Sequence, residues 1–98
     1  MLNNIIKQLD TCNKPILHVI FRNNNTRIAA LGLRKGQKLI DHQLPVAAKI
    51  ILLEGKIEID SKIEIVVLEK FNEYEIPKKV IHQVRTIENA LALIVLDF

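Results

Sequence analysis

The stretch Leu52-Leu53-Glu54-Gly55-Lys56-Ile57-Glu58-Ile59 decides the fold that this chain is expected to adopt. An apolar segment leads into Glu54-Gly55, and a segment of alternating apolar and charged side chains follows it. Glycine accepts the backbone of a tight turn, and alternation with a period of two is typical of a half-buried strand. We therefore expect one strand to end at Leu53, a turn at Glu54-Gly55 and a second strand over 56–59.

Further short strands are expected on both sides of this stretch. Turn residues recur at short intervals, among them three asparagines at 23–25, around which residues 16–33 should form a hairpin. Segments rich in strand-favouring residues lie at 15–22, 26–33, 37–43, 46–53, 62–68, 74–76, 80–86 and 90–96. Eight or nine short strands, with no helix of crossover length between them, favour an all-β sandwich or barrel.

The first residues of the chain show a different period. Apolar side chains at Leu2, Ile5, Ile6 and Leu9 follow the spacing of a short amphipathic helix. A chain of 98 residues, 49% of them hydrophobic, can build one packed core. We expect a single domain over 1–98, with an N-terminal helix within 1–12 and a barrel over 15–98.

Composition argues against several classes of partner. The net charge is +3, but lysines alternate with glutamates along the expected strands and aromatic residues are only 4% of the chain, so no nucleic-acid partner is expected. No apolar run approaches the roughly 20 residues of a membrane-spanning helix. The first residues lack the pattern of a signal peptide, and Cys12 is the only cysteine, which favours the cytoplasm.

Strand alternation also predicts an interior face. If residues 42–52 are extended, then His42, Leu44, Val46, Ala48, Ile50 and Leu52 share one face, because successive side chains point to opposite sides. That face is apolar apart from the histidine. His82 shares its face with Val80 and Val84. We expect both histidines to face one interior.

These positions resemble the motifs of the cupin family. Gly36, His42 and Gly55 fall at the spacing of the first cupin motif, and Pro77 and His82 match the second. The two motifs cover residues 36–86, about half of the chain. The resemblance implies a small RmlC-like jelly-roll barrel with a single cupin domain, and it implies that cupin-like pairing of strands joins two copies.

The resemblance also implies where a metal would bind, and there the sequence departs from it. Cupin metals are held by three histidines and one glutamate. The second histidine position is Leu44 and the glutamate position is Ala48, or Lys49 under a longer spacing. The glycine positions of the second motif hold Phe71 and Lys79, and its asparagine position holds Thr86. Because zinc sites use three or four protein ligands, we expect no cofactor, and a divalent metal on His42 and His82 only if an incomplete site binds one.

Three functions remain open. The first is a non-enzymatic, sensor-like barrel that binds a small molecule without metal, in a pocket of His42, Leu44, Ala48, Ile50, His82 and Val84, with binding that weakens as the histidines protonate below about pH 6. The second is a metal-dependent cupin enzyme, an isomerase or dioxygenase, with an incomplete two-histidine site. The third is a structural or interaction barrel without a ligand. No catalytic residue is assigned, because no nucleophile or phosphate-binding signature is present.

The last apolar run predicts a covered surface. Residues 90–96 are apolar on both faces, whereas a strand in a single-layer wall normally shows one polar face. Either the N-terminal helix covers the outer face or a second subunit does. Since two-fold dimers are the commonest assembly, we expect a homodimer.

Overall fold

A computed structural model describes residues 2–9, 14–42, 46–61, 64–76 and 80–97, with the side chains of residues 3, 8, 9 and 40–42 outside that description. Within these described residues, one helix precedes seven strands. In chain order they are α1 (Leu2–Leu9), β1 (Ile16–Arg22), β2 (Thr26–Leu33), β3 (Lys38–His42), β4 (Ala47–Ser61), β5 (Ile65–Leu68), β6 (Glu73–Ile76) and β7 (His82–Asp97). The all-β fold with a short N-terminal helix is therefore confirmed.

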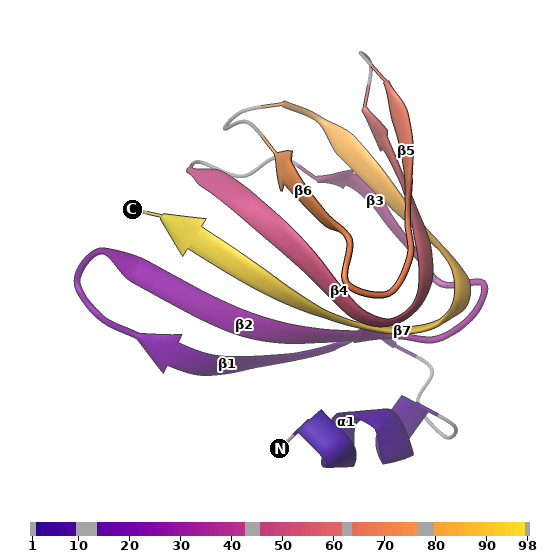
Figure 1. The fold of residues 1–98 in the computed structure, drawn as a ribbon, viewed down its shortest axis with the longest axis horizontal. Coiled ribbons are helices and arrows are strands. Elements are labelled where there is room, and N and C mark those ends of the chain that lie inside the picture. The colour runs from indigo at the N-terminus through magenta and orange to yellow at the C-terminus, as the bar shows by residue number, and fades with distance from the viewer. Residues whose placement is uncertain (1, 10–13, 43–45, 62–63, 77–79, 98) are drawn as a thin grey trace.

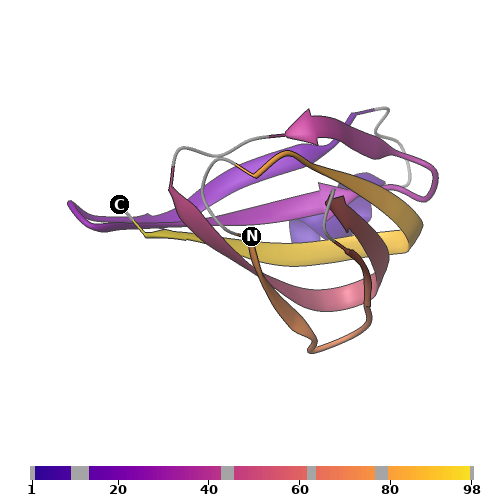
Figure 2. The ribbon, with the colours of Figure 1, turned by 90° about the horizontal axis from the view of Figure 1, so that it is seen from above.

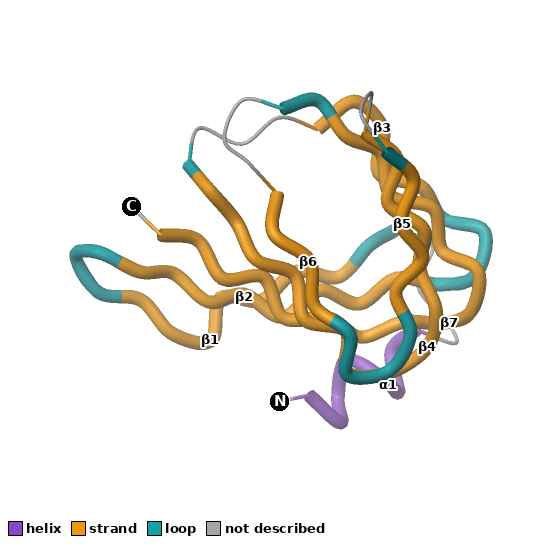
Figure 3. The backbone as a smooth tube through the Cα atoms, turned by 45° about the horizontal axis from the view of Figure 1, so that its top comes forward, coloured by secondary structure: helices purple, strands orange, loops and turns teal. Residues whose placement is uncertain are grey.

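Two long strands, β4 and β7, form the frame of the molecule. They pair antiparallel along almost their whole length, and both bend midway (Figure 1). The first half of β4 and the second half of β7 lie in a layer ordered β1-β2-β7-β4-β6. Their other halves lie in a layer ordered β3-β7-β4-β5. Two antiparallel layers that share bent strands enclose a barrel interior, as the tube in Figure 3 shows.

The bend in β4 corrects the prediction of a turn at Glu54-Gly55. The chain continues through both residues as one strand from Ala47 to Ser61. The pairing with β7 slips between Leu52, Glu54 and Lys56, which makes the site a β-bulge. Gly55 has φ 85°, and a Cβ there would collide with the carbonyl oxygen of Asn89. Because glycine has no Cβ, it can adopt this positive φ and let another backbone segment approach closely, in a bulge as well as in a turn.

The segments predicted at 80–86 and 90–96 are likewise one strand, β7, which begins at His82. Residues 87–89 cross the bend opposite Gly55 without leaving the strand. The Asn89 side chain accepts a hydrogen bond from the backbone N–H of Lys35 at 2.8 Å and so ties the 34–37 turn to the bend. Gly36 N–H donates to the Thr86 carbonyl at 2.9 Å, next to this contact.

The hairpin predicted over 16–33 is confirmed. β1 and β2 pair antiparallel from Ile16–Gly32 to Arg22–Arg27, around a turn in which the Asn23 side chain accepts two backbone hydrogen bonds of 2.8 Å. Seen from above in Figure 2, this hairpin extends past the start of β4 on one side of the barrel. β1 is an edge of its layer.

Helix α1 covers the outer face of the same layer (Figure 1). Ile5 is 1% exposed and packs in a cluster with buried residues of three strands and partly buried leucines, namely Ile16, Ala30, Leu91, Leu2, Leu53 and Leu93. The helix therefore accounts for part of the outer apolar face of residues 90–96. Of the described helices, none is long and apolar enough to cross a membrane.

The predicted interior face of β4 is confirmed where it is described. Ala48, Ile50 and Leu52 are buried in the main core together with Val84 of β7. The other members of this core come from β2, β4, β5, β6 and β7, and they are Leu31, Leu33, Ile57, Ile59, Leu68, Ile76, Ala90 and Ala92. The main core and the helix cluster thus lie on opposite faces of β2 and β7.

Candidate functional site

An apolar cavity of about 300 Å³ lies inside the barrel. Its described lining comes from Pro15, which precedes β1, and from strands β1, β2, β3, β4, β6 and β7. The strand residues are Leu17, Val19, Arg27, Ala29, Leu31, Leu39, Ile50, Ile57, Ile76, His82, Val84, Ala92, Ile94 and Leu96. Two lining residues of β1, Leu17 and Val19, are 60% and 46% exposed. The cavity is therefore reached from solvent beside the β1–β2 hairpin.

The sequence-predicted pocket residues are only partly brought together here. His82, Ile50 and Val84 line the cavity, and Ala48 is buried in the adjoining core. Leu44 lies outside the described residues. His42 ends β3, and its backbone is the register partner of His82. That these residues bind a ligand stays a prediction.

His82 is 5% exposed and has a defined orientation. Its Nδ1 lies 3.2 Å from the carbonyl oxygen of Val80. A carbonyl oxygen only accepts, so a proton on Nδ1 would be donated to Val80. The chain thus places this imidazole at the cavity wall, with Nδ1 toward the Val80 carbonyl.

A small hollow of about 110 Å³ adjoins His82 on another side. It is lined by Ser61, Glu64, Tyr74, Glu75, Ile76, Val80 and His82, so His82 and Ile76 line both spaces. The Tyr74 hydroxyl donates a 2.7 Å hydrogen bond to the Glu64 carboxylate. This hydrogen bond, together with burial and the charge of Glu64, raises the pKa of Tyr74 above its ordinary 10.0. Sequence reasoning missed this pair, because ten residues and a turn separate its members.

Sequence reasoning also missed Arg27. It is half-buried in β2 and lines the cavity on the same strand as Ala29 and Leu31. The period-two alternation of Arg27, Ala29, Leu31 and Leu33 carried the signal. Arg27 is the only permanently charged side chain among the lining residues that the structure describes.

The donor set at this site does not fit the metal that cupin motifs imply. Ala48, at the glutamate position, is buried in an apolar core. Among the described residues no three His, Cys, Asp or Glu side chains come together as metal ligands. The described cavity lining offers one imidazole and no carboxylate. The described residues therefore do not supply the ligands that such a metal needs.

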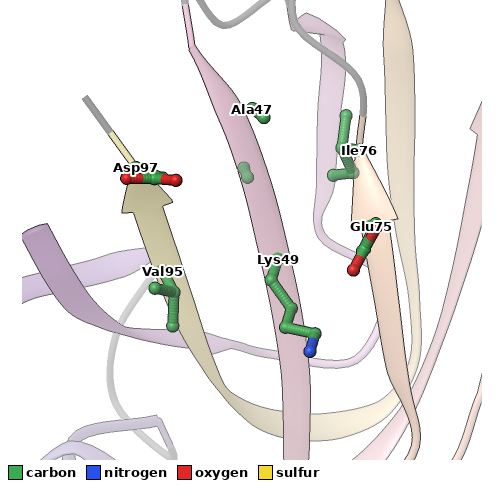
Figure 4. A pocket seen from close by; sticks show the side chains of 7 residues that line it. Ala47, Lys49, Glu75, Ile76, Val95 and Asp97 are labelled. Carbon is green, nitrogen blue, oxygen red and sulfur yellow. The ribbon is translucent and has the colours of Figure 1, made fainter. Parts of the chain in front are cut away.

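A second, larger hollow of about 460 Å³ lies at the ends of β4, β6 and β7. Figure 4 shows side chains of its lining residues Ala47, Lys49, Glu75, Ile76, Val95 and Asp97. Lys49 forms an exposed ion pair with Glu73 at 3.2 Å. The mixed charges and exposed side chains of this hollow are typical of a solvated sheet surface, so the barrel cavity is the stronger candidate site.

Comparison with known proteins gives no relative by sequence. No protein-family model matches the chain. No curated protein matches it either.

Comparison of structures gives many matches. A cupin superfamily protein from Desulfitobacterium hafniense superposes with a TM-score of 0.81 and 13% identity over 88% of this chain and 79% of that one. A cupin-2 domain protein from Shewanella frigidimarina has a TM-score of 0.78 and 19% identity over 100% and 93%. A protein described as of unknown function from Streptococcus pyogenes has a TM-score of 0.78 and 21% identity over 87% and 75%.

These likenesses, at identities near 20% or below, establish the fold. The chain has the fold of a small jelly-roll domain of the kind seen in RmlC-like cupins.

Proposed function

We propose that the barrel binds a small, mainly apolar molecule in its interior without the help of a metal. The observation that carries this proposal is the 300 Å³ cavity, in which all but two of the described lining residues are apolar. Small-molecule sites are typically concave and apolar with a few placed polar groups, and their volumes begin near about 300 Å³.

The cavity volume bounds the size of the ligand. An engineered apolar cavity of roughly 150 Å³ takes up benzene, so twice that volume suits a molecule of about 10 to 13 non-hydrogen atoms. The exposed side chains of Leu17 and Val19 give such a molecule a way in. His82 places an imidazole, a group able to form hydrogen bonds, at the wall of the cavity.

The direct test is a calorimetric titration with 1-octanol, supported by a matched pair of variants. Ile94 and Leu93 are neighbours on β7 and both are half-buried, but Ile94 lines the cavity and Leu93 packs against the helix cluster. Ile94→Phe reduces the free space and should weaken octanol binding by about tenfold, whereas Leu93→Phe should leave it unchanged. Failure of the wild-type protein to bind octanol would contradict the proposal.

Elemental analysis of the purified protein separates this function from that of a metal-dependent cupin enzyme. We expect metal well below one ion per chain, since Leu44 and Ala48 replace two of the four family ligands. One equivalent of a transition metal that is lost when His42 and His82 are both changed to alanine would favour the enzyme.

We also propose that the protein is a homodimer. The edge strand β1 also exposes apolar side chains that do not line the cavity, with Ile20 at 39% and Phe21 at 50% exposure. An exposed apolar edge strand pairs readily with another chain. Light scattering at micromolar concentration should give twice the monomer mass, and a monomer would contradict this proposal.

The proposed location is the cytoplasm. One cysteine in the chain allows no intrachain disulfide, which is usual in a reducing compartment. Fractionation of the source cells with an antibody against the protein should find it in the cytoplasmic fraction, and a periplasmic or secreted pool would contradict this location.

A further inference from the structure

Arg27 is placed where it would select the charge of a bound molecule. It is half-buried in β2 and lines the cavity together with Val19, Ala29 and Leu96. A guanidinium is charged at all physiological pH values and donates hydrogen bonds in a planar fork that matches a carboxylate. A charged group among apolar neighbours interacts with a ligand more strongly than it would in water.

The charges around Arg27 also favour a negatively charged ligand. Arg22 of β1 is the direct cross-strand partner of Arg27, and it is exposed. An anion beside two guanidinium groups interacts favourably with both of them. Asp97, the carboxylate that follows Leu96 on β7, lines the separate hollow with Ala47 and Lys49. The described cavity lining contains no acidic side chain.

We propose that the molecule bound in the barrel is an amphipathic carboxylate, with its carboxylate at Arg27 and its apolar body inside the cavity. This inference rests on the proposed binding function and adds the chemical class of the ligand. The apolar body lies along Ala29, Leu31 and Ile94, which share the interior face of β2 and β7. A straight-chain acid and an aromatic acid share this chemistry.

The test compares four probes by calorimetry: octanoate, 1-octanol, octylamine and 2-naphthoate. Octanoate should bind the wild-type protein about tenfold more tightly than 1-octanol, because a charge-assisted hydrogen bond contributes roughly that factor. Octylamine should bind more weakly than 1-octanol. Whichever of octanoate and 2-naphthoate binds more tightly identifies a chain or a ring as the preferred body.

Three variants assign the selectivity to one side chain. Arg27→Gln should remove the preference, so that octanoate and 1-octanol bind this variant with equal affinity, and circular dichroism checks that its barrel is folded. Arg27→Lys should keep part of the preference. Arg34→Gln removes the same charge from the exposed turn between β2 and β3, so it controls for net charge and should keep the full preference.

The outcomes separate this inference from the function on which it rests. Equal affinity for octanoate and 1-octanol, or a preference for octylamine, would overturn the inference and leave the binding function standing. A preference for octanoate that survives in Arg27→Gln would also overturn it. If none of the four probes binds, the binding function itself is wrong.

Discussion

The two faces of the β1-β2-β7-β4 layer are built from the same strands but differ in what covers them. On the outer face α1 packs against part of the apolar surface, and Ile5 and Leu91 are buried there. On the inner face the side chains of Leu17 and Val19 border a cavity and remain exposed. The helix therefore stabilises one face, whereas the other face borders the cavity that we propose as a binding site. Changes on the outer face should alter stability, and changes on the inner face should alter binding.

The largest expected effect on stability comes from substitution at the bend of β4 and β7, which folds the sheet around its inner face. Gly36 and Gly55 have similar positive φ angles, 88° and 85°, but only Gly55 has backbone atoms within contact distance of an added Cβ. Gly55→Ala should lower the free energy of unfolding by about 4 kcal/mol, because it adds both backbone strain and overpacking. Gly36→Ala should lower it by about 1 kcal/mol, because it adds strain alone. Urea denaturation measures both. Equal costs would mean that the approach of Asn89 does not shape the barrel.

The next effect tests the sealed face. Ile5→Ala removes a side chain that is 1% exposed beneath the sheet and should cost about 2 to 4 kcal/mol of unfolding free energy. Octanol affinity measured well below the melting temperature should stay unchanged, because Ile5 does not line the cavity. Ile6→Ala is the matched control, since Ile6 is 42% exposed and should cost less than about 1 kcal/mol. Loss of octanol binding in Ile5→Ala would show that the two faces are coupled.

A smaller effect is expected at a turn that belongs to neither face. Phe71 has φ 69°, although it is not glycine, and it occupies a position where the cupin motif has glycine. Phe71 is 72% exposed, and the Lys70 ammonium nitrogen lies 5.2 Å from the centre of its ring. Phe71→Gly relieves strain but adds chain entropy to the unfolded state, so we expect a net stabilisation of about 0.5 kcal/mol. A lower melting temperature would show that the contact with Lys70 outweighs the strain.

The smallest effect is a shift in titration beside the cavity. Tyr74 is the only tyrosine and the chain has no tryptophan, so near-ultraviolet absorbance reports its ionisation alone. The midpoint should lie above 10.0, and Glu64→Gln should move it back toward that value. Glu69→Gln, on the ion pair with Lys56, should not move it.

The sign of this titration also fixes its effect on stability. The folded protein holds the Tyr74 hydroxyl protonated, so the hydrogen bond to Glu64 stabilises the fold below about pH 10. This stabilisation is lost as pH rises through the pKa of Tyr74 in the folded protein. Tyr74→Phe should remove that loss. An unshifted midpoint would contradict the hydrogen bond to Glu64.

Much of this fold could be predicted because alternation along a strand is a local property. The hairpin over 16–33 and the burial of Ala48, Ile50 and Leu52 follow from residues that are adjacent in sequence. Whether Glu54-Gly55 is a turn or a bulge depends instead on Asn89, more than thirty residues away. The residues around Glu54-Gly55 have the same sequence pattern whether they form a turn or a bulge.

The candidate site shows the same division. His82 and Val84 were placed inside by their strand pattern, and the pattern of β2 would have placed Arg27 there as well. The contact between Tyr74 and Glu64 depends on how the end of β4, the start of β5 and β6 come together, which no single segment encodes. Alternation predicts which face a side chain takes, but tertiary packing decides which side chains meet.

The most direct test of the difference between the two faces is a methyl NMR titration with 1-octanol. Methyl signals of inner-face residues Leu31, Ile50 and Ile94 should shift on addition of octanol, because these side chains line the cavity. Methyl signals of Ile5, Leu53 and Leu91, in the helix cluster, should not shift. Shifts confined to the helix cluster, or no shifts at all, would contradict a ligand-binding inner face.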